Sequence, residues 1–215
     1  MHVTLEFAAI LEQPLVTETP AIVQDSDAAL VRASQQGDTE AFGQLYQRYA
    51  RMVHGILLSR VHATDVEDLV QDVFLRALPR LRGLREASRF GGWLAAIARN
   101  MANDFHRRAQ TRAESRDAAV DPDEQAAPGT ASVAREATEI LECIRSLPEA
   151  YRETLILRLV EGMNGPEIAE RTGLMPGSVR VNLHRGMQQL RDKLAAHRTL
   201  EELERARPNA GGRRI

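Results

Sequence analysis

The chain has 215 residues, of which 43% are hydrophobic and only 4% aromatic, and its formal net charge is −2. The low aromatic content and the abundance of Leu, Ala, Val and Ile suit packed helices better than a β-sandwich, and together with the pattern along the chain they predict an all-α protein of two small helical domains joined by a flexible linker. The single cysteine, Cys143, excludes an intramolecular disulfide, and no cluster of Cys and His has zinc-site spacing, so neither a metal nor a cofactor is expected. No apolar run reaches the roughly 20 residues that span a bilayer, and no signal peptide is evident, so we expect a cytoplasmic protein.

The first part of the chain changes from an irregular acidic segment to regular helices. Residues 1–26 contain four acids and neither Lys nor Arg, and we interpret them as a flexible extension. Helical periodicity begins at Asp27, which starts the first predicted domain, residues 27–110. Asp38 is the predicted N-cap of a longer helix whose apolar residues recur every three or four positions.

The next predicted helix begins with a capping box formed by Thr64 and Glu67 and ends at Pro79. Its apolar stripe leaves a polar face, on which three residues lie within one turn: Asp68, Gln71 and Asp72. Such a face can be solvated, or it can meet cationic side chains of a protein partner.

An Arg-rich loop and a helix near 88–109 complete the first predicted domain. Residues 76–112 contain nine Arg against two acids, which indicates a surface for a polyanion, although Arg runs are also found on solvated helices. Cationic tracks combined with amides and a stacking surface bind single-stranded DNA. The helix offers six candidates for such a site: Trp93, Arg99, Asn100, Asp104, Arg107 and Arg108. For Trp93 a core position is the favoured alternative, and for Asn100 a buried polar position is the less favoured one.

Residues 111–134 show no period and contain Pro and Gly, as a linker does. A second domain is predicted for residues 135–196, with a tail at 197–215. Its helices are expected at about 134–146, 149–161, 165–172 and 176–196, and the third begins at Asn164 or Gly165 with Pro166 in its first turn.

The last two of these helices have helix-turn-helix spacing. Ala169 permits a close helix crossing, Gly173 accepts the left-handed turn, and Val179 closes the small core. The amino-terminal half of the final helix is the part that enters a major groove in this motif. Its predicted exposed residues are Ser178, Arg180, Val181, His184 and Arg185.

Two stretches resemble the sigma-70 family of bacterial RNA polymerase initiation factors. TDVEDLVQDVFLRALPRLRG with WLAAIARNMANDFHRR looks like region 2, and LPEAYRETLILRLVEGMNGPEIAERTGLMPGSVRVNLHRGMQQLRDKL looks like region 4. The short linker between them resembles the extracytoplasmic-function group. The resemblance implies a non-enzymatic factor that binds core RNA polymerase and promoter DNA, with an anti-sigma factor as a further partner.

The resemblance also implies a role for each candidate. The face with Asp68, Gln71 and Asp72 would dock on the coiled coil of the polymerase beta-prime subunit, and the beta flap would be a second contact. The helix candidates, together with a loop that includes Leu81, Arg82 and Arg89, would capture a flipped base of the melted minus-10 element. The residues of the final helix would face the minus-35 element.

Other classes remain open at this point. A helix-turn-helix regulator that acts without polymerase would explain residues 135–196 but would leave the first domain without a role. An enzyme is disfavoured because no HExxH, P-loop or dinucleotide glycine pattern is present. A decoy that only holds an anti-sigma factor would fail to melt promoters. We further expect the free protein to bind promoter DNA poorly, because its acidic segments compete for its small basic faces.

Overall fold

A computed structural model describes residues 26–114 and 131–206, and every regular element in this part of the chain is an α-helix or a short 3-10 helix. The predicted all-α fold with two helical domains is therefore confirmed. Within the described residues, none of the helices has the length and apolarity needed to cross a membrane. Apart from Ser26, the predicted N-terminal extension lies outside the described residues, as do 115–130 of the linker and 207–215 of the tail.

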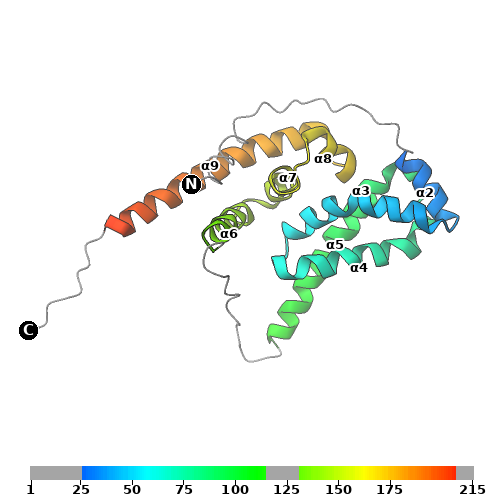
Figure 1. The fold of residues 1–215 in the computed structure, drawn as a ribbon, viewed down its shortest axis with the longest axis horizontal. Coiled ribbons are helices and arrows are strands. Elements are labelled where there is room, and N and C mark those ends of the chain that lie inside the picture. Colours follow the sequence, from blue (N-terminus) through cyan, green and yellow to red (C-terminus); the bar gives the residue numbers. More distant parts are fainter. Residues whose placement is uncertain (1–25, 115–130, 207–215) are drawn as a thin grey trace, which may run out of the picture.

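The first half forms a bundle of four helices (Figure 1). Side chains cap the first two helices: the Ser26 hydroxyl accepts a hydrogen bond from the Ala29 amide, and the Asp38 carboxylate accepts from the amides of Glu40 and Ala41. The Asp38 cap was predicted. The helices are α2 (Asp27–Gln35), α3 (Thr39–Leu58), α4 (Ala63–Arg80) and α5 (Phe90–Glu114), with 3-10 turns at Leu81–Gly83 and Ala87–Arg89 between the last two.

The predicted capping box at the start of α4 is wrong. The N-cap is His62, which makes no side-chain capping bond, and Thr64 lies inside the first turn. A residue inside the first turn cannot act as the N-cap, and the Thr64 hydroxyl instead lies 3.2 Å from the His62 ring nitrogen Nδ1.

The second half contains four more helices, which begin and end near the predicted positions. The Asn164 side chain accepts a hydrogen bond from the Glu167 amide at 2.9 Å, and Gly173 adopts the left-handed conformation with φ 71°, both as predicted. Helical structure reaches further into the predicted linker and tail than the sequence suggested. The helices are α6 (Ala131–Arg145), α7 (Glu149–Leu159), α8 (Gly165–Thr172) and α9 (Pro176–Ala206).

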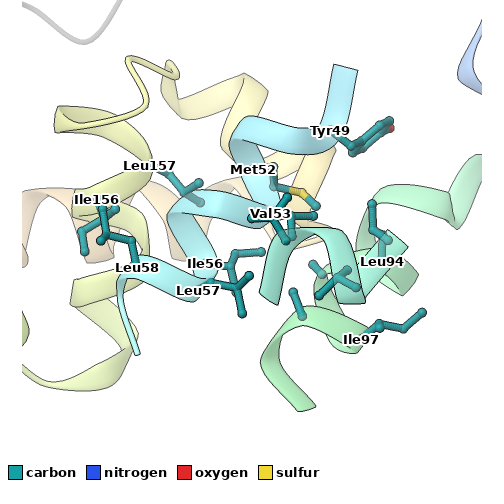
Figure 2. Close-up of a cluster of buried hydrophobic side chains, with 14 of the residues drawn as sticks. Tyr49, Met52, Val53, Ile56, Leu57, Leu58, Leu94, Ile97, Ile156 and Leu157 are labelled. Atoms are coloured by element: carbon teal, nitrogen blue, oxygen red, sulfur yellow. The ribbon is translucent and has the colours of Figure 1, made fainter. Parts of the chain in front are cut away.

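The two halves pack directly against each other and share one continuous hydrophobic core. Helix α3 is central to it: Met52 and Ile56 are fully buried, and Leu58 at its carboxyl end lies in the same cluster as Ile156 and Leu157 of α7 (Figure 2). The apolar spacing of α3 predicted the bundle core. That spacing did not predict that α7 would cover the end of α3.

Candidate polymerase and DNA interfaces

Helix α4 presents the predicted polar face to solvent. Asp68, Gln71 and Asp72 are all exposed, whereas Val66 and Val73 are fully buried on the opposite face. Burial of one apolar face against the bundle fixes the rotation of the helix, and this rotation sets the three polar side chains outward. The face is therefore available to a partner protein.

Two leucines extend this polar face, and neither was selected from the sequence. Leu75 lies three residues after Asp72 and is 69% exposed, and Leu78 follows at 45%. Leu78 continues the three- and four-residue spacing of the apolar stripe, yet it lies outside the core. Residues three and four apart share a helix face, so the two leucines continue the line of Asp68 and Asp72. Adjacent exposed apolar side chains that are rimmed by polar groups are found at protein-binding surfaces.

Helix α5 arranges most of the predicted DNA-binding residues along one face. Asn100, Arg107 and Arg108 are exposed, and their spacing of seven and eight residues brings them to the same side of the helix. Trp93, seven residues before Asn100, is half-buried, and its ring centroid lies 5.8 Å from that of Phe90. The tryptophan thus anchors the start of the helix while part of its surface stays accessible.

Asp104 lies within this basic face and reduces its positive charge. Its carboxylate accepts a hydrogen bond from Arg107 and lies 3.7 Å from Arg76 of α4. The bond from Arg107 is the main reason that the pKa of Asp104 falls below its usual value. The group therefore stays ionised, and Arg107 is partly neutralised in the absence of DNA.

The loop before α5 is held by Gln35 of α2, whose side-chain amide donates to the carbonyls of Leu81 at 3.0 Å and Leu84 at 2.8 Å. Arg82 and Arg89 project into solvent. Leu81 does not, because its side chain is only 1% exposed and is part of the core. The expectation that the Leu81 side chain contacts DNA is therefore not met in this conformation. Leu81 instead packs in the core and anchors the loop to it.

Arg99 is separated from the other basic residues of α5. Successive residues of a helix differ by about 100° in direction, so Arg99 and its neighbour Asn100 face different surroundings. Arg99 donates to both carboxylate oxygens of Glu153 on α7, Nη2 to Oε1 at 2.6 Å and Nε to Oε2 at 3.0 Å. The structure thus places Arg99 between the two halves of the chain.

Helices α8 and α9 form the predicted helix-turn-helix. Ala169, Val179 and Leu183 are buried between them, and Gly173 makes the turn. This packing directs one side of α9 outward, and all five predicted groove-facing residues are exposed: Ser178, Arg180, Val181, His184 and Arg185. Met175, just before α9, is 72% exposed and lies next to this surface.

Two protein families match the chain, one in its first half and the other in its second half. Sigma-70 region 2 matches residues 45–112, and Sigma-70, region 4, matches residues 137–190. The first match contains α4 and α5, and the second contains the helix-turn-helix.

Known proteins similar to the chain include two initiation factors. The ECF RNA polymerase sigma-E factor of Haemophilus influenzae is 31% identical over 182 residues, which cover 80% of this chain and 96% of that protein. The RNA polymerase sigma factor CarQ of Myxococcus xanthus is 35% identical over 164 residues, covering 74% and 92%.

Among solved structures, CnrH in complex with the cytosolic domain of CnrY superimposes with a TM-score of 0.57 and 26% identity, and the alignment covers 80% of this chain and 99% of CnrH. The order of the two regions, the helix-turn-helix and these similarities agree with one another. The chain belongs to the extracytoplasmic-function group of the sigma-70 family, whose members are non-catalytic RNA polymerase subunits that direct promoter recognition.

Proposed function

We propose that this sigma factor binds polymerase and promoter DNA through three exposed surfaces, with residues 27–110 and 135–196 as its functional domains. The acidic face of α4 binds core polymerase, the basic face of α5 with its preceding loop binds the single-stranded minus-10 element, and α9 binds the duplex minus-35 element. The observation that carries the proposal is that buried residues behind each surface orient its polar side chains toward solvent.

Charge and shape support the polymerase surface on α4. Asp68 and Asp72 supply two exposed carboxylates and Leu75 an exposed apolar contact, a combination that suits a partner helix with basic and apolar side chains. We assign the coiled coil of the beta-prime subunit as this partner. The second domain has the beta flap as its expected polymerase contact.

The two DNA surfaces offer different side chains, as expected for one surface that binds single-stranded DNA and another that binds a duplex. On α5, Asn100 offers an amide for the edge of an unpaired base while Arg82, Arg89, Arg107 and Arg108 lie near enough in the chain to follow the backbone. On α9, Arg180 and Arg185 can reach base edges or phosphates, and Val181 offers an apolar contact for a thymine methyl group.

A protein regulator is the further partner that we propose. CnrH, whose fold this chain resembles, was solved with the cytosolic domain of CnrY bound. By analogy, an anti-sigma factor that covers the exposed surfaces of this chain would restrain it until a signal releases it.

The test is transcription in vitro with purified core polymerase and a genomic DNA library. Wild type is compared with Asp72→Arg, which reverses a charge of the α4 surface, and with Arg185→Ala, which removes a cation of α9. We expect specific start sites that disappear with Asp72→Arg and weaken with Arg185→Ala. Absence of core-dependent initiation would favour a helix-turn-helix regulator that acts without polymerase, and start sites that are indifferent to both changes would also contradict the proposal.

A further inference from the structure

The loop between α4 and α5, residues 81–89, is held by a side chain of a distant helix. Gln35 is the last residue of α2, and its Nε2 donates to the carbonyls of Leu81 at 3.0 Å and Leu84 at 2.8 Å. An amide nitrogen carries two hydrogen atoms, so Gln35 uses both of its donors on this loop. One side chain thus binds both ends of the turn that joins Leu81 to Leu84.

The two carbonyls receive different support from the loop itself. The Leu81 carbonyl also accepts the Leu84 amide at 3.0 Å, a bond that closes the first 3-10 turn. Leu84 is extended, with φ −75° and ψ 106°, so its carbonyl lies outside any helix. A half-buried carbonyl without a donor is unfavourable, and Gln35 supplies this donor where the chain leaves the turn.

Helix α2 is attached firmly enough to hold the loop. At its start, the Asp27 carboxylate accepts hydrogen bonds from Arg48 at 2.6 Å and from the Tyr49 hydroxyl at 2.5 Å, both on α3. The face that α2 buries in the bundle consists of Leu30, Val31 and Ser34. Helix α2 also packs against both 3-10 turns of the loop. The start of α2 is therefore fixed to α3, and its end, at Gln35, is fixed to the loop.

The loop presents cations between buried anchors. Leu81 before it and Phe90 after it are each 1% exposed, and the exposed basic residues between them are Arg82, Arg85 and Arg89. Arg85 was not selected from the sequence. Burial of apolar side chains is not directional, whereas hydrogen bonds fix the orientation of the groups that they join. The bonds from Gln35 therefore set the path of the backbone that carries these arginines.

We infer that Gln35 is a positioning residue for the minus-10 strand, which acts through the Leu81 and Leu84 carbonyls and orders the 81–89 loop before DNA binds. The inference rests on the proposed function, which assigns this loop and α5 to single-stranded DNA. A loop that is already ordered loses less conformational entropy on binding than a mobile loop, and its affinity for the strand is correspondingly higher.

Two measurements separate the order of the loop from its use, and both compare the same variants. Gln35→Glu removes both donors at nearly the same size, and Gln35→Ala removes them without adding a charge. Gln36→Glu and Gln36→Ala are the matched controls, because Gln36 is the next residue and is exposed. The two Glu variants place the same new charge near the end of α2, so a difference between them does not come from charge alone.

The first measurement is amide hydrogen exchange of the free, full-length factor, followed by mass spectrometry. Two hydrogen bonds of ordinary strength change an equilibrium between ordered and open forms by about 5- to 30-fold. We therefore expect the amides of residues 82–89 to exchange about 5- to 30-fold faster in both Gln35 variants and at the wild-type rate in both Gln36 variants. Exchange in α9 should be the same in all of them.

The second measurement is the affinity of the holoenzyme for two DNA probes. One is a single strand with the minus-10 sequence of a start site found by transcription in vitro, and the other is a duplex with its minus-35 sequence. We expect both Gln35 variants to bind the strand about 3- to 10-fold more weakly, because a smaller fraction of the loops is ordered. Their affinity for the duplex should equal that of wild type and of the Gln36 variants.

Three results would overturn the inference. Unchanged exchange in both Gln35 variants would show that the amide does not order the loop, and faster exchange with unchanged affinity for the strand would show that loop order does not serve DNA binding. Faster exchange throughout the chain, with weaker binding of both probes, would make Gln35 a residue of general stability. Wild-type holoenzyme that fails to bind the strand would overturn the assignment of the DNA surface itself, and the inference with it.

Discussion

Arg99 and Glu153 form a two-bond ion pair across the boundary between the two domains, although they are separated by 54 positions in the sequence. The pair is formed at the side of α5 adjacent to the face that carries Asn100. One helix therefore serves two purposes: one face is kept for nucleic acid, and the next holds the second domain in place.

Arg99→Gln and Asn100→Ala should consequently have opposite effects. Loss of Arg99 leaves Glu153 with Arg60 as its main cation and weakens the contact between the two halves, so the free energy of unfolding in urea falls while core-dependent transcription is kept. Loss of Asn100 leaves this contact intact and lowers transcription, by about tenfold if the amide reads a base. Equal losses of transcription in both variants would instead assign Arg99 to DNA, as the sequence first suggested.

Leu75→Ser should weaken polymerase binding without destabilising the factor. The side chain is 69% exposed and contributes little to its own core, so the melting temperature should stay within about 1 °C of wild type. An apolar anchor buried in the complex is worth about 1–3 kcal/mol, which predicts an affinity for core polymerase that is about 5- to 150-fold lower. Fluorescence anisotropy with labelled factor measures the affinity. Leu69→Ser, on the buried face, is the contrasting variant and should lower the melting temperature.

The helices and their exposed faces were predictable because both depend on local patterns. The caps at Asp38 and Asn164 and the left-handed turn at Gly173 follow from side-chain chemistry within a few residues. Leu81 was misplaced, because a loop residue between charged neighbours gives no periodic signal of its burial. The ion pairs of Glu153 with Arg60 and Arg99 could not be predicted, since Glu153 resembles any helix carboxylate until α3 and α5 lie beside it.

Arg185→Ala should reduce the number of phosphate contacts or base contacts made by α9. If Arg185 binds a phosphate, the slope of log affinity against log salt for a duplex with the minus-35 element should become shallower by about one. Lys193→Ala makes the same charge change two turns further along α9 and should leave the slope nearly unchanged. Binding of the holoenzyme to duplexes at several salt concentrations supplies both slopes. Loss of affinity for one base pair with no change in slope would assign Arg185 to base recognition.

Asn164→Ala should destabilise the helix-turn-helix. The Asn164 side chain is the N-cap of α8 and accepts a hydrogen bond from the Glu167 amide. Loss of such a cap lowers the free energy of unfolding by about 1 kcal/mol. Urea denaturation followed by circular dichroism should show this decrease in the free energy of unfolding. Asn164→Ser, which keeps a capping oxygen, should restore most of it, whereas equal losses in the two variants would indicate that the cap is not responsible.

His54 should make the contact between the two halves depend on pH. Its Nδ1 lies 2.6 Å from the Glu161 carboxylate of the second domain, and this hydrogen bond is the main cause that raises the pKa of His54. Burial lowers the pKa and Glu67 raises it slightly, while Arg51 lies 3.8 Å from the same Glu161 carboxylate.

Because the pKa of His54 is higher in the folded protein than in the unfolded chain, its contribution to stability is complete below the ordinary histidine value of about 6.5 and is lost as the pH rises through the raised pKa. Urea denaturation should therefore show that wild type is more stable than His54→Asn at acidic pH, and this difference should shrink as the pH rises. His62→Asn, which alters an exposed histidine, should show no such difference. A difference between wild type and His54→Asn that is the same at every pH would show that the charge of His54 does not contribute.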